Sequence, residues 1–484
     1  MLMFRVNFGV KFSVNGNFAA IGTQGDRLAA TLRRLAAGGE YEVTASGRNT
    51  VQGRNAQWRA IAGSVCLAVC GWSSAASAQA AFDPTAGKGD IFKRNKYVSV
   101  TQRPQPEFDP KPIQIAGAEL LADAHSELAY NSNVLATDTN RRDDASVVFG
   151  GEANLLATPG GNQLSAFAQA DVTRFFDVKS ENAERYAVGG AGIFGTGRES
   201  TVQIGADYLY QPLSRQSELS PISTQRQINF AQYHAFAGAT YGPGRVHVSG
   251  TLDYVGRRFS DVPSQDPVAP QLDFGDRDFF SFTGRADYAV TGSVALFAQG
   301  KGTLYDYSSN RIAAPSRDSD GIEMLAGLNF ELSAPIRGEV SVGYISRHYD
   351  DAAYRDFSDI GFHARVDYFP TALLTVGVTA DREFGDTSII GVGGVRLDRI
   401  RLKADYEALR NLTLTAEGGV SFQDYRGIDL KYTFFTAGFS GEYAVSPALA
   451  GKFYYRFQDR DAEGTVIGRE FNASQFGAGM SYRF

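Results

Sequence analysis

The chain has 484 residues, a formal net charge of −6 at pH 7 and 53 glycines, with 34 Phe and 23 Tyr against 2 Trp. Its mean hydropathy is −0.22, and no apolar run reaches the length of about 18 residues that a spanning helix requires, which excludes a helical membrane protein. The negative net charge gives no reason to expect nucleic acid as a partner.

The first 80 residues predict a processed N-terminus. Residues 51–80 contain two arginines, then the apolar run IAGSVCLAVCGW and the small-residue stretch SSAASAQA. This is the layout of a secretory signal peptide with an A-x-A cleavage site, and a buried core helix is the alternative. Residues 1–50 show no repeat or core pattern and are predicted to be a mis-called start or a disordered extension. Both cysteines, Cys66 and Cys70, lie in the apolar run, so the mature chain is expected to have no thiol.

Residues 81–115 carry the Pro-rich stretch RPQPEFDPKP. Proline has no backbone N–H and a fixed φ, so a regular helix or a central strand cannot continue through this stretch. We therefore predict an extended segment on the periplasmic side.

From about Leu120, alternating runs such as VHVSGTLDY and IGFHARVDY place apolar residues at every second position. A soluble β-sandwich also alternates, but its strands are shorter than these runs of about 10–15 residues. Short connectors such as TPGGN and YGPGR fall between mostly longer polar ones such as SRQSELSPISTQRQ. Residues 116–484 are therefore predicted to be all-β, forming a transmembrane antiparallel up-and-down β-barrel of about 18 strands with both termini on the short-turn side.

Aromatic residues recur near the end of the strands that run toward the short turns. Ordinary β-propensity explains why tyrosine is abundant but not why its placement is regular. We expect these rings to form an aromatic girdle at one membrane interface. They are Tyr241, Tyr288, Phe330, Tyr368, Tyr406, Tyr443 and Tyr482.

The chain ends in GAGMSYRF, a pattern of period two that continues to the last residue. Phe476, Met480, Tyr482 and Phe484 share one apolar face, which is expected to contact lipid. The terminal aromatic residue closes the predicted barrel. It also resembles the C-terminal signal read by the outer-membrane barrel assembly machinery.

Charged residues on the opposite face of the strands are the candidates for a pore lining. Basic candidates come from the later strands and acidic ones from the early strands, so a basic wall would roughly face an acidic wall and orient polar solutes. The alternative is that these charges pair with cross-strand neighbours and stiffen the wall. The candidates are Arg365, Arg399, Arg401, Lys403, Lys452, Arg456, Asp123, Glu127, Glu152 and Asp171.

No catalytic motif accompanies these charges. The sequence has no G-x-S-x-G elbow, no P-loop and no H-E-x-x-H, and its five histidines do not show ligand spacing on one strand. We therefore expect no enzyme activity, no metal site and no cofactor.

The segment RPQPEFDPKPIQIAGAEL, followed by AYNSNVLAT, resembles the opening of the bacterial outer-membrane family known as putative β-barrel porin 2. The match includes Arg103, Pro104, Pro106, Glu107, Phe108, Asp109 and Pro110, and more loosely Tyr130 to Asn133. Lys111 and Pro112 depart from the family pattern, which usually has a glycine nearby. The resemblance implies a Gram-negative outer-membrane barrel. It also implies an association with exopolysaccharide synthesis and export.

Two functions remain open from the sequence. The first is a porin-like passive or weakly selective channel for small polar solutes. The second is a non-enzymatic outer-membrane component of exopolysaccharide or capsule assembly or export, to whose partners the Pro-rich segment would dock. The expected partners are outer-membrane lipid, the barrel assembly machinery and, in the second case, polysaccharide export components.

Overall fold

The computed structural model describes residues 98–484 except 198, 216–225, 261–275, 309–314, 333–334, 388, 390 and 467. The chain divides into two compact units, Met1–Val43 and Thr44–Phe484, and only the second contains described residues. The predictions for residues 1–50 and 51–80, and for 81–97 of the Pro-rich segment, therefore lie outside the described residues.

The described residues form strands joined by turns and loops, with three short 3₁₀ turns: η2 (Val100–Gln102), η3 (Pro159–Gly161) and η4 (Lys179–Glu181). The early strands are β1 (Ile113–Ile115), β2 (Ala118–Asn131), β3 (Asp144–Ala157), β4 (Gln163–Phe175), β5 (Ala183–Gly195), β6 (Ser200–Pro212), β7 (Asn229–Tyr241), β8 (Val246–Phe259) and β9 (Asp276–Ala289). The later strands are β10 (Val294–Ser308), β11 (Ser319–Glu331), β12 (Ile336–Tyr349), β13 (Phe357–Thr371), β14 (Leu374–Gly385), β15 (Val395–Leu409), β16 (Leu412–Tyr425), β17 (Leu430–Ser446), β18 (Leu449–Gly464) and β19 (Phe471–Arg483).

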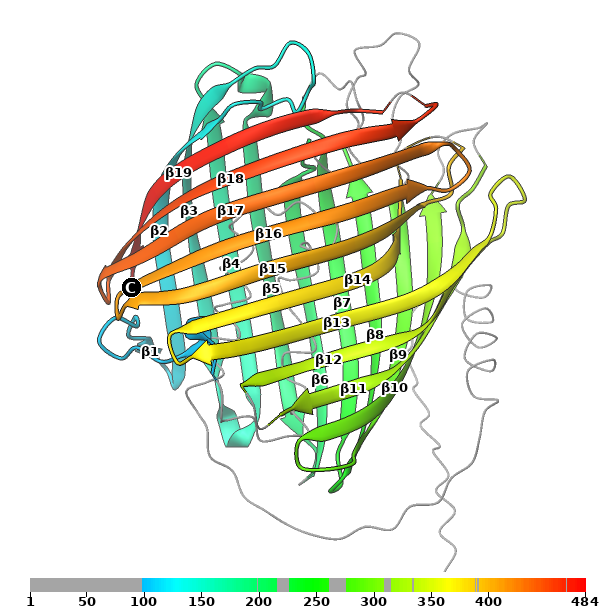
Figure 1. The fold of residues 1–484 in the computed structure, drawn as a ribbon. Coiled ribbons are helices and arrows are strands. Elements are labelled where there is room, and N and C mark those ends of the chain that lie inside the picture. Colours follow the sequence, from blue (N-terminus) through cyan, green and yellow to red (C-terminus); the bar gives the residue numbers. More distant parts are fainter. Residues whose placement is uncertain are drawn as a thin grey trace, which may run out of the picture. The chain divides into compact units, whose positions relative to one another are not determined.

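Strands β2 to β19 form a closed antiparallel barrel (Figure 1). Each strand pairs with the next along the chain, and β19 returns to β2 in a register that runs from Gln475↔Asn131 to Arg483↔Asp123. Closure removes every free sheet edge, which membrane barrels need because lipid cannot hydrogen-bond to an exposed backbone. The predicted fold class and the predicted number of 18 strands are confirmed.

The connectors differ in length between the two ends of the barrel. One end carries only short turns, such as 372–373, 410–411 and 447–448, whereas the other carries longer loops such as 213–228 and 260–275. The start of β2 and the end of β19 both lie at the short-turn end, where the Phe484 amide donates to the Ala122 carbonyl over 2.8 Å. The predicted positions of the barrel's termini are therefore correct.

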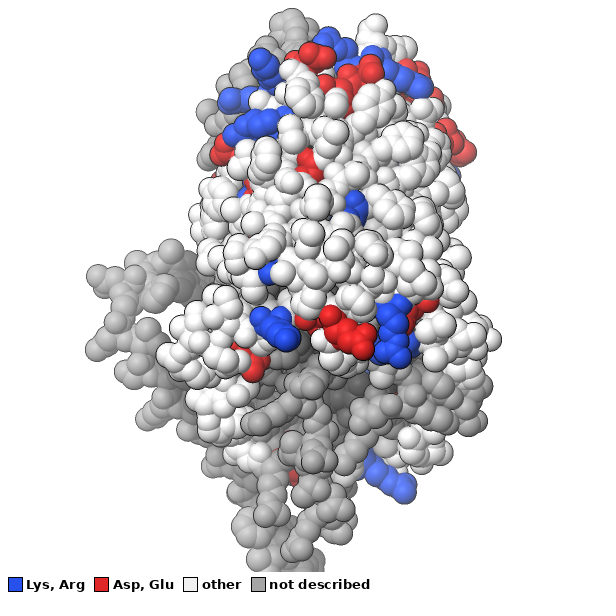
Figure 2. Space-filling view, turned by 90° about the vertical axis from the view of Figure 1, so that its left-hand side faces the viewer, with Lys and Arg blue, Asp and Glu red and all other residues white. Residues whose placement is uncertain are grey.

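The outer face of the barrel is apolar. Side chains such as Ile360, Phe149 and Val342 are more than half exposed, and alternate with residues that point inward. Figure 2 shows Lys, Arg, Asp and Glu gathered in two bands on one side, with a mostly uncharged zone between them. An exposed apolar belt of this extent is rare on a soluble monomer and fits a lipid-facing wall. At the C-terminus the lipid face consists of Phe476, Met480, Tyr482 and Phe484, which are 50%, 56%, 52% and 49% exposed.

The aromatic positions predicted from the sequence lie on this outer face. Six of the seven are exposed, while Phe330 is partly buried beside Val294 and Gly338 of the neighbouring strands. All seven are close to the short turns in the strand register. This arrangement is that of an interfacial aromatic girdle.

Strand pairing begins earlier than the sequence indicated. Ile113–Ile115 forms β1, which pairs with the start of β2 through a turn at Ala116 and Gly117, both with positive φ. The preceding prolines keep residues 104–112 out of the sheet, as expected. Across the described part of the chain, no helix has the length and apolar character that crossing a membrane requires.

Hydrophobic clusters inside the barrel lie toward the loop end. One joins Val392 of the β14–β15 loop to Val395, Leu397, Tyr425 and Leu430 on β15 to β17. Another joins Leu213 and Ile228, which flank the β6–β7 loop, to Phe167, Leu209 and Phe230. Val392 and the residues that flank the β6–β7 loop are therefore packed onto the inner wall.

Candidate pore and its charged lining

Arg399, Arg401 and Lys403 lie at alternate positions of β15 and point inward, opposite the lipid-facing Ile400 and Leu402. Each cation has a carboxylate partner. Arg399 Nε donates to Asp381 over 2.9 Å and also pairs with Glu383, Arg401 lies 3.4 Å from Asp381, and Lys403 lies 3.1 Å from Asp405. Three cations therefore meet three carboxylates; the Arg399 and Arg401 contacts cross to β14, as in the cross-strand pairing alternative, whereas Lys403 and Asp405 pair along β15.

The other basic candidates differ in exposure. Arg365 shares the inward face of β13 with His363 and Asp367, is exposed, and makes no ion pair with any other described residue. Lys452 and Arg456 on β18 flank the ring of Tyr454, each 5.9 Å from its centre. Arg365 thus offers a solvated positive charge on the inner wall.

The acidic candidates form a second group on β2 to β4. His125 lies between two of them, with Nδ1 at 3.0 Å from Asp123 and Nε2 at 2.9 Å from Asp171. Glu152, opposite Asp123 in the register, accepts a hydrogen bond from Asn154. Gly150 makes the bridge possible, because a Cβ there would lie 2.1 Å from the Asp171 carboxylate.

Glu127 joins the first strand of the barrel to the second-last. The Tyr454 hydroxyl donates to Glu127 over 2.6 Å, across the intervening strand β19. Gly477 of that strand leaves room, since a Cβ there would lie 2.3 Å from the Tyr454 ring. This hydrogen bond connects β18 to β2 on the inner face, across the strand β19 that closes the barrel.

Arginines near the loop end form a further group, which the sequence analysis missed. Arg277 of β9 and Arg347 of β12 are 1% and 2% exposed and lie 3.6 and 3.0 Å from Asp386, in the loop after β14. The Tyr307 hydroxyl donates to the same carboxylate over 2.5 Å. The inward position of the arginines could have been found from strand alternation, but nothing in the sequence reveals that a loop residue reaches them.

Asp386 remains ionised in this position. Burial would raise the pKa of its carboxyl, but the Arg277 and Arg347 guanidiniums outweigh burial and hold that pKa well below its usual range. The ionised carboxylate therefore anchors the β14–β15 loop to the wall formed by β9, β10 and β12.

A second set of contacts ties other loops together at the same end. Arg215 after β6 makes two hydrogen bonds to Glu181 of η4, at 2.5 and 3.0 Å. Arg469 before β19 donates to the carbonyls of Ala136, Leu135 and Arg215. Residues of four loops are thus linked through Glu181, Arg215 and Arg469, whose side chains have little exposure.

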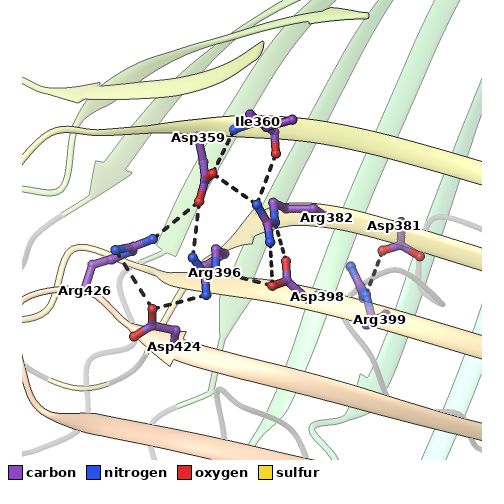
Figure 3. Close-up of polar contacts among 9 residues, drawn as sticks. All are labelled: Asp359, Ile360, Asp381, Arg382, Arg396, Asp398, Arg399, Asp424 and Arg426. Atoms are coloured by element: carbon purple, nitrogen blue, oxygen red, sulfur yellow. Dashed lines mark hydrogen bonds and ion pairs between the residues drawn. The ribbon is translucent and has the colours of Figure 1, made fainter. Parts of the chain in front are cut away.

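Figure 3 shows a separate network that begins where the β13–β14 ladder ends at His363↔Asp381. Beyond that pair, Arg382 donates to the Ile360 carbonyl and to Asp359 across the gap. The network continues through Arg396, Asp398, Asp424 and Arg426. Arg382 and Asp398 alternate with the inward pair Asp381 and Arg399, so they belong to the outer side of the wall. Three arginines balance three aspartates there.

At the short-turn end, the N-terminal segment reaches the inner wall. The Val100 amide donates to Thr375 over 3.0 Å, and the Arg103 guanidinium donates to Glu407 over 2.7 Å. Thr375 and Glu407 are inward-facing residues of β14 and β15, which lie six and five strands from β2 around the ring by the shorter route. The segment therefore crosses part of this mouth.

Arg103→Glu is expected to release the segment, because it sets a carboxylate against the nearly buried Glu407. Proteolysis at residues 98–112 of the folded protein should become faster, while Arg103→Lys should retain the wild-type rate. Equal rates for all three proteins would show that this ion pair does not hold the segment.

Within the described ranges, no group of three or more His, Cys, Asp or Glu side chains is arranged to hold a metal ion. What the inner wall offers is a polar surface in which most charges are paired across strands. Such a surface can be solvated and can orient charged solutes.

Comparisons with known proteins agree with this geometry. A family model described as putative beta-barrel porin 2 matches residues 105–484. Similar solved structures include OccAB4 of Acinetobacter baumannii, with 10% identity, a TM-score of 0.42, and coverage of 79% of this chain and 100% of that chain. OpdL of Pseudomonas aeruginosa has 12% identity, a TM-score of 0.41, and coverage of 76% and 100%. A mutant of the ferric enterobactin receptor PfeA from Pseudomonas aeruginosa has 8% identity, a TM-score of 0.42, and coverage of 75% and 80%.

With identities of 8–12% and TM-scores below 0.5, these likenesses say nothing about what the chain transports. A search of curated proteins finds no significant match. The family match, by contrast, spans the Pro-rich segment from residue 105 and the whole barrel. The chain therefore belongs to the putative beta-barrel porin 2 family and is a porin-type barrel of the bacterial outer membrane.

Proposed function

We propose that the protein is a passive or weakly selective channel for small polar solutes. The observation that carries this proposal is the charged inner face of a closed 18-strand barrel. Barrels of 16–18 strands are wide enough to leave an aqueous channel, and charges that face a lumen need water or partners. The exposed, inward-facing Arg365 supports a solvated interior.

Ordered contacts hold segments of the chain at both mouths of the proposed channel. Arg103 holds the N-terminal segment at one mouth, and Asp386 and Arg469 hold loops at the other. We therefore expect a conductance below that of an unobstructed barrel of the same strand number.

Single-channel recording of the purified full chain in planar lipid bilayers tests the proposal. Discrete current steps that are absent from detergent-only and heat-denatured samples would support a channel. The absence of steps from correctly folded protein would reject it, and would leave the second candidate function.

That second candidate is a non-conducting component of exopolysaccharide or capsule assembly or export. It is supported by the Pro-rich segment, in which Pro104, Pro106, Glu107 and Lys111 are exposed and could contact a periplasmic partner. Cross-linking through this segment in cells that produce the polysaccharide would separate the two candidates, because a simple channel needs no partner there.

Removing an acidic residue and removing a basic residue from the inner face of β14 and β15 should change the ion selectivity in opposite directions. Asp381→Asn should leave Arg399 and Arg401 in excess and shift the reversal potential toward anions, whereas Arg399→Gln should shift it toward cations. Both shifts should be largest at low salt, because salt screens the field.

Asp398→Asn is the matched control for this measurement. It removes the same charge from the neighbouring strand, but on the outer side, where Arg382 and Arg396 contact it (Figure 3). Equal shifts for Asp381→Asn and Asp398→Asn would contradict the assignment of Asp381 to the channel wall.

A further inference from the structure

The buried arginines near the loop end lie in one row across adjacent strands. Arg277 is the direct register partner of Arg257 on one side and of Tyr307 on the other. Like charges directly opposite each other on paired strands are destabilising. Two strands beyond Tyr307, Arg347 donates to the Tyr307 hydroxyl over 3.2 Å and so extends the row.

Arg277 is the least satisfied member of this row. Its side chain is 1% exposed, yet none of its three nitrogens makes a hydrogen bond to any described residue. The Phe259, Phe279 and Tyr307 rings lie 5.3 to 5.9 Å from the guanidinium carbon, which supplies cation–π attraction but no acceptor. A buried guanidinium with five N–H groups is normally matched by carboxylate or phosphate oxygens.

The Asp386 carboxylate is the anion nearest to Arg277 among the described residues, but it makes no hydrogen bond to the Arg277 guanidinium. Its Oδ1 accepts the hydrogen bonds from Arg347 and Tyr307, whereas its other oxygen is 3.6 Å from Arg277, beyond hydrogen-bond length. Arg277 and Arg347 thus share one carboxylate, which leaves one positive charge in excess between these three groups. Asp386 follows Gly385, the last residue of β14, so its position depends on how the β14–β15 loop is folded.

We propose that Arg277 and Arg347 form a binding site for a compact oxyanion, the carboxylate or phosphate group of a small solute, for which Asp386 is the internal competitor. An entering oxyanion takes the place of the Asp386 carboxylate, completes the hydrogen bonds of Arg277 and releases Asp386 from the wall. The site deepens the channel proposal by naming the solute class, but binding at the site does not require conduction.

Thermal unfolding of the full chain in detergent at pH 7 tests the site, with inorganic phosphate as the probe and chloride at matched ionic strength as the reference. Phosphate should raise the unfolding temperature of the wild type more than chloride does, because a ligand that binds only the folded state stabilises it. Arg277→Gln should lose this difference. Arg382→Gln, which removes the same charge from the outer network, should keep it.

Asp386→Asn supplies the sharper measurement. Without the competing charge, the apparent phosphate affinity measured by titration calorimetry should rise by at least about fivefold, in the range usual for coupled sites. An unchanged affinity in Asp386→Asn, or an equal phosphate effect in the wild type and in Arg277→Gln, would overturn the proposal. If Asp386→Asn does not assemble, the comparison of the wild type with Arg277→Gln decides alone.

These experiments can reject the oxyanion site and the channel independently of each other. Phosphate binding without current steps would reject the channel and keep the site, whereas current steps with no phosphate effect that depends on Arg277 would keep the channel and reject the site.

Discussion

Replacing Phe484 with Asp is expected to reduce the amount of barrel in the outer membrane severely, whereas Ser481→Asp should leave most of it. Phe484 is 49% exposed on the lipid face, packs edge-to-face on Tyr482 at 4.9 Å, and its amide closes the barrel onto Ala122. Ser481 lies on the inward face, opposite His125 of β2, where an added carboxylate can be solvated.

The expected loss of Phe484→Asp barrel from the outer membrane is larger than the change in folding stability alone would cause. A charge on the lipid face costs about 2–4 kcal/mol at the bilayer midplane for Arg or Lys, less for Asp, and about 0–1 kcal/mol near an interface. Phe484 lies at the short-turn end, close to an interface, so a severe loss would point to recognition. We propose that the barrel assembly machinery reads the face formed by Phe476, Met480, Tyr482 and Phe484.

Outer-membrane fractions from cells that express each variant give the measurement, with Phe484→Leu as a control that keeps an apolar end. Phe484→Leu should lie between the wild type and Phe484→Asp. Equal levels of Phe484→Asp and Ser481→Asp in the membrane would contradict the role of the lipid-facing register.

The barrel wall could be predicted because a membrane barrel repeats one simple constraint on every strand. Lipid outside and water inside impose a period of two, so the exposed Tyr368 and the inward Arg365 could be assigned from IGFHARVDY alone. Antiparallel neighbours joined by short turns then fix the order of the strands. The three-residue strand β1 was missed because Ile113–Ile115 follows directly on Pro112 and is too short to show a period.

The pairing of the lumen charges could not be predicted in the same way. Alternation gives the face of Arg399 but not its partner, since Asp381 is its neighbour only through the register of β14 against β15. The bridge from His125 to Asp171 depends on Gly150 of the strand between them, whose role appears only when three strands are aligned. Loop residues such as Asp386 follow no period, so the contact with Arg277 required the structure.

Glu181→Ala is expected to open the loop end of the barrel without unfolding the wall. Glu181 is fully buried and Arg215 is 6% exposed, and removing one member of such a pair leaves the other charge uncompensated at a cost of about 3–5 kcal/mol. The Arg215 carbonyl also accepts a hydrogen bond from Arg469, so the loop that contains Ala136 should loosen as well.

Proteinase K digestion of the folded protein measures this opening. Cleavage within residues 213–228 should become faster in Glu181→Ala, while the unfolding temperature of the barrel changes little because all eighteen ladders remain. Glu184→Ala is the matched control: it removes an exposed carboxylate that pairs with Arg174, and exposed pairs contribute at most about 1 kcal/mol.

The double variant Glu181→Ala/Arg215→Met then separates the pair from its burial. Removing both charges should restore part of the wild-type protection. The methionine introduced at position 215 can be buried without the cost of an unpaired charge, which Arg215 carries when Glu181 alone is removed. The same protection in Glu181→Ala as in Glu184→Ala would show that the buried pair does not hold the loops. In that case the Arg469 contacts alone would account for the ordered loop end.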